Sequence, residues 1–212
     1  MKTIKITVFL VLAVSFFSAC KKSSGDKKTD TITAEYYFKG TLNGQAVTWQ
    51  AAIDGTPGFF TGSSGALSVD QGVTTGELTA LLSASTGFKP QLGIGFRTFN
   101  VNYNQDIPAY FNSFVNIGAW GFAVNDNHTV GVKAIAIYYT DAQGKTYSSV
   151  GSQTAGSANV LVVSPEAARV GSNESLKIKL TFSCTLYPTD GTGATLPLAN
   201  AEATVLLEDL LH

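Results

Sequence analysis

The chain has 212 residues and a formal net charge of −1, from 14 basic and 15 acidic side chains. This balance argues against a basic nucleic-acid-binding protein, and two His with two Cys argue against a multi-ligand zinc site or a disulfide framework. Charged residues make up only 14% of the chain, compared with about a quarter in ordinary soluble domains. The length suits a single domain with a substantial hydrophobic core.

The first 19 residues are typical of an export signal, because two Lys precede an apolar run over 6–19. This run is too short to cross a hydrocarbon core, which needs roughly 20 residues. It ends in Phe17-Ser18-Ala19-Cys20, which resembles the lipobox of bacterial lipoproteins, with Phe17 where that motif usually has Leu. The resemblance implies a signal peptide at 1–19, cleavage before Cys20 and diacylation of the Cys20 sulfur. The alternative is an ordinary secretory signal that ends in Cys by chance.

Residues 20–34 form the expected tether between the lipid anchor and the folded part. The segment is polar, contains four Lys and lacks aromatic residues, which is typical of a flexible linker. Lys21 stands where Asp would signal inner-membrane retention, so by resemblance we expect the outer membrane, on either its periplasmic or its cell-surface side. Asp30-Thr31-Ile32 resembles the O-glycosylation acceptor of exported Bacteroidetes proteins, which makes Thr31 a candidate glycosylation site. The alternative for this tripeptide is a plain tether.

From residue 35 to the C-terminus we expect one all-β domain, because short β-branched and aromatic runs alternate with Gly, Asn and Asp. The best-defined hairpin has strands at 35–42 and 45–51 around Asn43-Gly44, a pair typical of a two-residue type I′ turn. This turn opposes Leu42 to Gln45, Gly40 to Val47 and Phe38 to Trp49. The same register places six side chains on one face: Tyr36, Phe38, Leu42, Val47, Trp49 and Ala51.

Apolar and polar residues alternate along Ser175–Tyr187 and Ala201–Glu208, which predicts a hairpin with a long loop. Cys184 falls on the apolar face of its strand, so we expect a buried and inert thiol. Asp141–Gly144 predicts a tight turn, and Pro165–Arg169 a single helical turn at most. Further strands are expected at 65–70, 77–85, 91–103, 113–125, 130–140, 145–150 and 158–163. About ten strands favour an antiparallel two-sheet sandwich, with a closed lipocalin-like barrel as the alternative.

The chain contains no motif that points to catalysis or to a cofactor. Gly93-Ile-Gly95 lies in a strand-like run and opens no helix, so it is not a dinucleotide-binding loop. His128 is the one imidazole before the C-terminal residue, and the preceding Asn125-Asp126-Asn127 predicts a solvated turn. A hydrolase would need His128 or a carboxylate pair in a cleft, and no such pair stands out. We therefore expect no enzymatic activity, no metal site and no cofactor.

One stretch, 96–128, combines aromatic residues with Asn and with one of the two Arg of the chain. Carbohydrate sites use this chemistry, because an aromatic face stacks on a sugar ring while amides and Arg bind its hydroxyl groups. The alternative is that the aromatic residues belong to the core and the Asn to turns. The candidate ligand-binding residues are Arg97, Asn102, Tyr103, Asn104, Tyr110 and Trp120.

Several short motifs are spread along the folded part: Phe38–Gly44 with Trp49, Asp141–Gly144, Tyr147–Ser149, Gly151–Gln153, Phe182–Tyr187, Asp190-Gly191 and Leu198–Asn200. Together they resemble a family of uncharacterised small Bacteroidetes lipoproteins. The resemblance implies an exported single-domain β-sandwich and offers no catalytic residues. The expected role is non-enzymatic binding at the cell envelope, of carbohydrate or another small ligand. The alternative is a structural or accessory subunit that contacts another envelope protein at the outer membrane.

Overall fold

In the computed structural model of the chain, the described residues are 35–50, 60–70, 73–84, 89–100, 115, 118–125, 133–153, 158–170 and 173–208. These residues contain eleven strands and no helix. The strands are β1 (Tyr37–Leu42), β2 (Gln45–Gln50), β3 (Phe60–Asp70), β4 (Val73–Ser83), β5 (Gln91–Asn100), β6 (Gly118–Phe122), β7 (Ala134–Thr140), β8 (Thr146–Ser148), β9 (Ala158–Val170), β10 (Asn173–Pro188) and β11 (Leu196–Glu208). The predictions for the signal peptide, the tether, Cys20, Thr31, Asn102, Tyr103, Asn104, Tyr110 and His128 lie outside the described residues.

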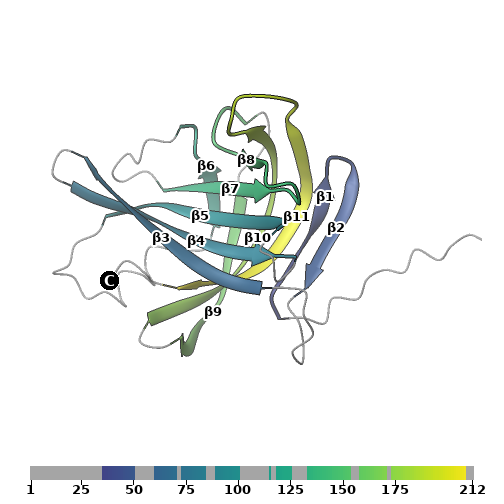
Figure 1. The fold of residues 1–212 in the computed structure, drawn as a ribbon. Helices are drawn as coiled ribbons and strands as arrows, with labels where there is room; N and C mark the ends of the chain where they lie inside the picture. Colours follow the sequence, from purple (N-terminus) through teal and green to yellow (C-terminus); the bar gives the residue numbers. More distant parts are fainter. Residues whose placement is uncertain are drawn as a thin grey trace, which may run out of the picture. The chain divides into compact units, whose positions relative to one another are not determined.

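The described strands form one hydrogen-bonded path in the order β2-β1-β11-β10-β9-β6-β7-β5-β4-β3, and β8 pairs with both β7 and β10. All pairs are antiparallel except β6 with β7. The path curls into a half-barrel (Figure 1). The prediction of an antiparallel all-β fold is therefore confirmed for this part of the chain.

Two predicted tight turns are confirmed. Asn43 and Gly44 both have positive φ, 49° and 78°, as a type I′ turn requires. The hairpin register is also as predicted, with Phe38 opposite Trp49 and their ring centroids 5.3 Å apart. In the second turn, Asp141–Gly144, the last amide donates to the first carbonyl at 3.0 Å. Local turn chemistry thus decides both reversals of the chain.

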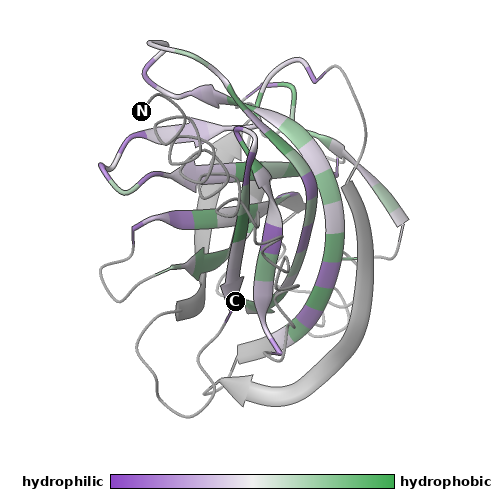
Figure 2. Ribbon diagram, turned by 90° about the vertical axis from the view of Figure 1, so that its right-hand side faces the viewer, coloured by the Kyte–Doolittle hydropathy of each residue, from purple (hydrophilic) through white to green (hydrophobic). Residues whose placement is uncertain are grey.

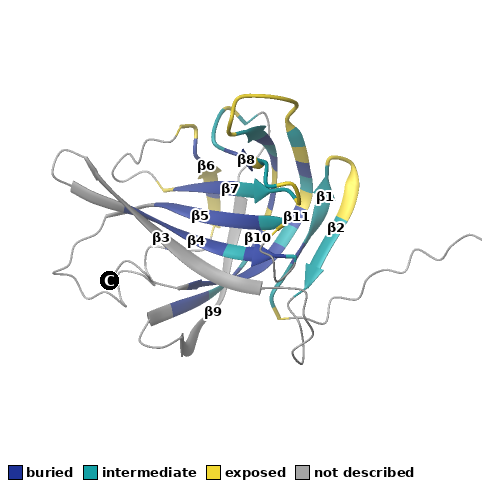
Figure 3. Ribbon diagram, viewed as in Figure 1, coloured by how far each residue is buried: buried dark blue, intermediate teal, exposed yellow. Residues whose placement is uncertain are grey.

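The main hydrophobic core lies on one face of the curled sheet, and strand alternation decides which side chains reach it. In β10 the even-numbered residues from Leu176 to Leu186 are buried, as predicted, and the odd-numbered ones between them are not (Figures 2 and 3). Cys184 is one of the buried residues, and its burial raises the pKa of the thiol to about 12. Distant parts of the path meet in this core, since Leu78 of β4 and Val205 of β11 belong to one cluster.

The strand predicted at 158–163 is confirmed, but it continues to Val170 as β9, beyond the predicted end. The sequence predicts a single helical turn at most over Pro165–Arg169, but these residues belong to strand β9, which pairs with β10, so a helical turn there is wrong. Pro165 lies opposite Leu176, between two irregularities of the β9–β10 register. Irregular positions of a ladder tolerate a residue that has no amide hydrogen. Pairing with β10 therefore outweighs the local helical preference of the Glu-Ala-Ala segment.

Two of the short sequence motifs, Gly151–Gln153 and Phe182–Tyr187, lie side by side, where the segment after β8 packs against β10. The Gln153 side-chain amide donates to the carbonyls of Ser149 and Thr185 at 2.6 and 3.0 Å, and its oxygen accepts from the Thr185 amide at 2.8 Å. The Tyr187 hydroxyl donates to the Ser152 carbonyl at 2.5 Å. These contacts give the motifs a structural role, because they close the end of the sheet where β8 joins β10.

Candidate functional site

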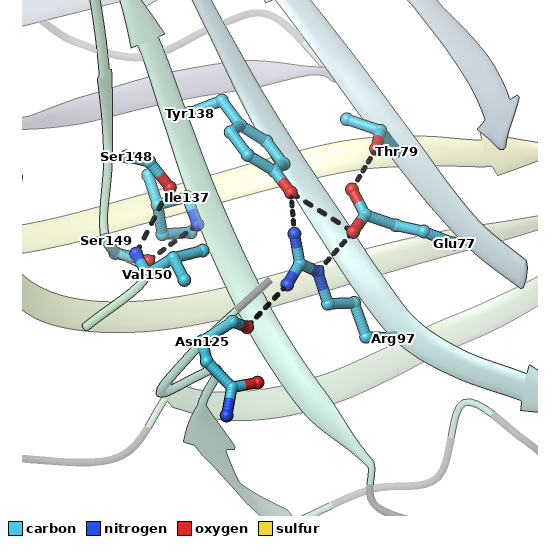
Figure 4. A network of polar contacts seen from close by, with 9 residues as sticks. All are labelled: Glu77, Thr79, Arg97, Asn125, Ile137, Tyr138, Ser148, Ser149 and Val150. Atoms are coloured by element: carbon cyan, nitrogen blue, oxygen red, sulfur yellow. Dashed lines mark hydrogen bonds and ion pairs between the residues drawn. The ribbon is translucent and has the colours of Figure 1, made fainter. Parts of the chain in front are cut away.

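A buried ionic network lies on β4, β5 and β7, on the face of the sheet opposite the main core (Figure 4). Strand alternation sends Leu78 and Phe96 into the core and their neighbours Glu77 and Arg97 to the other face. The β4–β5 register places Glu77 directly opposite Arg97, and Tyr138 reaches both from β7. Glu77 is 6% exposed and Arg97 5%. The sheet thus brings together a carboxylate, a guanidinium and a phenol from three strands.

Both carboxylate oxygens of Glu77 and all three guanidinium nitrogens of Arg97 have hydrogen-bond partners. One carboxylate oxygen accepts from Thr79 at 3.0 Å, and the other accepts from Arg97 Nε and from the Tyr138 hydroxyl, the latter at 3.1 Å. Arg97 Nη1 donates to the carbonyl of Asn125 at 3.1 Å, and Nη2 donates to the Tyr138 oxygen. The network therefore ties β4, β5 and β7 to one another and to the segment that follows β6.

The pKa values of Arg97 and Tyr138 are both raised by their surroundings in this network. Burial lowers the pKa of Arg97, but the neighbouring Glu77 carboxylate and Tyr138 outweigh it, and the pKa is raised overall. Burial and the Glu77 charge raise the pKa of Tyr138 well above its usual value. Arg97 thus stays protonated and Tyr138 stays neutral near pH 7, so neither group is poised to exchange a proton with a substrate.

Sequence reasoning missed Glu77 and Tyr138, although one signal pointed to them. Gly93 and Gly95 interrupt the strand-like run of β5, and glycine inside a strand often marks a close approach. A Cβ added at Gly95 would lie 2.8 Å from Glu77 Cδ and 3.1 Å from Tyr138 Cε2. Gly95 therefore leaves the space that the carboxylate and the phenol ring occupy.

Two of the six predicted ligand-binding residues lie in the described part, and neither belongs to an open binding surface. Arg97, predicted to bind a ligand, has its guanidinium engaged inside the protein by Glu77, Tyr138 and Asn125. Trp120, predicted as a stacking platform, is 3% exposed and packs edge-on against Phe96, with ring centroids 5.7 Å apart. For these two residues the alternative of a structural role is the one that the geometry supports. Core packing and ion pairing use the same residue types as a sugar site, so composition alone could not separate them.

A second polar cluster surrounds Glu202 of β11, on the outer face of the sheet. Its carboxylate accepts a hydrogen bond from Tyr37 and forms ion pairs with Lys39 at 3.3 Å and Lys179 at 3.1 Å. The hydrogen bond from Tyr37 and the two Lys lower the pKa of Glu202 to about 2, against the opposing effect of partial burial. The carboxylate is therefore ionised throughout the pH range in which most proteins are studied.

Replacing Glu202 by Gln is expected to remove part of the acid sensitivity of the fold. The folded-state pKa of about 2 lies below the ordinary value of 4.5, so the ionised carboxylate contributes its stabilisation fully above about pH 4.5. That contribution is lost as the pH falls from 4.5 through about 2. Urea unfolding of both proteins across this range measures the difference between their free energies of unfolding. The wild type should be more stable above pH 4.5, and the difference should shrink toward low pH. A stability difference that does not change with pH would contradict a stabilising role of the ionised Glu202 carboxylate.

Strand β2 forms one end of the strand path, and within the described part of the chain no strand pairs with its outer edge. Among the described residues it pairs with β1 alone, whereas β3, at the other end, pairs with β4 and also approaches β11. Natural edge strands usually contain charges, Pro or bulges that discourage pairing, but the sequence QAVTWQ contains no charge and no Pro. The two-residue turn directs the backbone groups of Val47 toward β1, so those of Ala46 and Thr48 point away from it. Ala46 is exposed and Thr48 half-buried (Figure 3).

The described residues contain no group of three or more His, Cys, Asp or Glu placed to hold a metal ion. Within the same residues, no helix is long and apolar enough to span a membrane. Comparison of the chain with protein-family models, with curated proteins and with solved structures finds no match.

Proposed function

We propose that the chain is a lipid-anchored protein of the bacterial cell envelope that acts without catalysis, by contact with another protein chain. The observation that carries this proposal is the β2 edge, which presents outward-pointing backbone groups at Ala46 and Thr48 and no charge that would repel a strand. An extended segment can add to such an edge through main-chain hydrogen bonds, with alternate side chains giving specificity. This is the structural or accessory role that the sequence left as an alternative.

The proposed anchor rests on the sequence at Phe17–Cys20, and the tether on the polar segment 20–34. Attachment through two acyl chains is stable, whereas one chain alone gives only marginal binding. An outer-membrane location and glycosylation at Thr31 are part of the same proposal. Anchoring would confine the folded part near its partners in the envelope, which favours weak contacts through a high local concentration.

A carbohydrate-binding role is supported less well. Of its six candidate residues, Arg97 and Trp120 are engaged within the fold, by an ion pair and by core packing. The sugar-site proposal therefore depends on Asn102, Tyr103, Asn104 and Tyr110. The β2 edge is an observation that favours protein contact specifically, so we place the protein-contact role first.

We also propose that the two halves of the curled sheet pack on each other as the two layers of a β-sandwich. One layer would contain β2, β1, β11, β10 and β9, and the other would contain β7, β5, β4 and β3. Support comes from the core, in which Leu78 and Leu82 of β4 cluster with Val205 and Leu207 of β11. This arrangement leaves the β2 edge at the margin of one layer, where an added strand would extend the sheet without disturbing the core.

Cross-linking from position 48 tests the protein-contact role. The full chain, expressed in bacteria with its own leader, would have a photoreactive phenylalanine analogue at Thr48 or, as the matched control, at Thr181. Thr181 is an exposed Thr, but it lies on β10 and pairs on both sides, with Glu202 and Asn159. A discrete adduct in intact cells from position 48 and none from position 181 is expected. Equal labelling from both positions, or none from position 48, would rule out β2 as the contact edge.

A further inference from the structure

We infer that the partner of β2 is a second copy of the same strand, so that two chains join edge to edge through antiparallel β2 strands with a two-fold axis at Thr48. The inference rests on the proposed function and deepens it by naming the partner. A two-fold contact of this kind is isologous, because the same surface is used on both copies. Its requirement is that β2 be complementary to itself in backbone bonding, side-chain pairing and charge.

The backbone of β2 meets the first requirement. Antiparallel strands form their bonds between residues whose backbone groups point at each other, and Thr48 points away from β1. A two-fold axis at Thr48 places this residue opposite its own copy, as a hydrogen-bonded pair with Cα atoms about 5.5 Å apart. No hydrogen bond between β1 and β2 has to break, because Val47 and Trp49 supply those bonds.

The side chains meet the second requirement on both faces. The same axis places Val47 of one copy opposite Trp49 of the second copy, on the face that packs on the core through Phe38. Pairs of an aromatic with a β-branched residue are among the favourable cross-strand pairs, and so are Thr–Thr pairs. The other face has the Thr48 pair at its centre. A shift of one residue would turn Trp49 to the opposite face, so the axis at Thr48 keeps the apolar face of the joined sheet continuous.

Charge does not oppose the contact. The nearest cation along the cross-strand row is Lys39 of β1, opposite Thr48, and it forms an ion pair with Glu202 at 3.3 Å. In the paired sheet the two copies of Lys39 would be separated by three strand spacings. With about 4.8 Å per spacing, this distance is about 14 Å. That separation exceeds the screening length of about 8 Å at physiological salt. An uncharged edge gives no preference for an acidic or a basic partner, whereas it fits its own copy.

Cysteine substitution tests this register. Thr48→Cys and, as the control, Ala46→Cys would each be introduced into the full, membrane-anchored chain, with Cys184 replaced by Ala in both. In the proposed dimer the two copies of position 48 face each other within disulfide range, whereas the two copies of position 46 are offset by four residues, about 13 Å. Mild oxidation is expected to double the apparent mass of the Thr48→Cys chain on non-reducing gels and to leave the Ala46→Cys chain unchanged.

The outcomes separate this inference from the proposed function. Equal cross-linking of both variants would indicate random collision and overturn the self-pairing. Absence of the Thr48→Cys dimer, together with a position-48 photoadduct to a different chain, would overturn self-pairing and leave the proposed protein contact standing. Absence of both products would overturn both. As an independent check, Thr48→Pro removes an amide that is not bonded to β1, so the monomer should stay folded while the dimer is lost.

Discussion

Replacing Arg97 by Met is expected to lower the free energy of unfolding by about 3–5 kcal/mol, because it leaves the Glu77 carboxylate buried without a counter-charge. Glu77 is 6% exposed, so water cannot easily take the place of the guanidinium. The substitution also removes the donors to the Asn125 carbonyl and the Tyr138 oxygen. Urea unfolding of the full chain measures the loss.

Two controls identify the cause of this loss. Lys179→Met removes one member of a half-exposed ion pair on the same sheet and should cost about 1 kcal/mol or less. Combining Arg97→Met with Glu77→Leu removes both buried charges and should recover part of the stability that Arg97→Met loses. If Arg97→Met costs no more than Lys179→Met, Arg97 is not a buried structural cation, and its role as a ligand-binding residue would regain support.

Trp120→Ala is expected to cost about 3–5 kcal/mol, the usual range for removal of a large buried aromatic side chain. Trp120 is 3% exposed and packs against Phe96 in the main core, so its removal leaves a cavity between β6 and β5. For a chain of this size the expected fall in Tm is roughly 6–20 °C, from about 2–4 °C per kcal/mol. Thermal unfolding followed by circular dichroism provides the measurement.

The control for Trp120→Ala is Val124, which lies just after the end of β6. Val124 is 71% exposed, and its replacement by Ala should change stability by no more than about 0.5 kcal/mol. A Trp120→Ala chain with unchanged Tm would contradict the core position of the indole. It would instead support a surface ring that is free to stack on a ligand.

The parts of the fold that sequence predicts well are those decided by local chemistry. Asn43-Gly44 needs positive φ at both positions, so turn type and hairpin register follow from two adjacent residues. The alternation from Leu176 to Leu186 likewise fixes which face of β10 is buried, and the burial of Cys184 follows from it. Pro165 shows the limit of local reasoning, because its strand conformation depends on the pairing of β9 with β10.

The buried network could not be derived from sequence because it depends on register between strands. Arg97 is one of only two Arg in the sequence, but its partners Glu77 and Tyr138 are 20 and 41 residues away in the chain. The register that brings Glu77 opposite Arg97 runs without a shift from the Ser83–Gln91 pair, and no sequence pattern specifies how β4 and β5 are aligned. The edge position of β2 was equally hidden, since it depends on the order of strands across the whole sheet.

The most direct test of the proposed role is the comparison of photo-cross-linking from positions 48 and 181 in intact cells. Both positions are Thr on the outer face of the sheet, but position 48 lies on the edge strand and position 181 on an interior strand. A discrete adduct from position 48 alone is the expected result. The same labelling at both positions, or no adduct from position 48, would contradict a function exerted through the β2 edge.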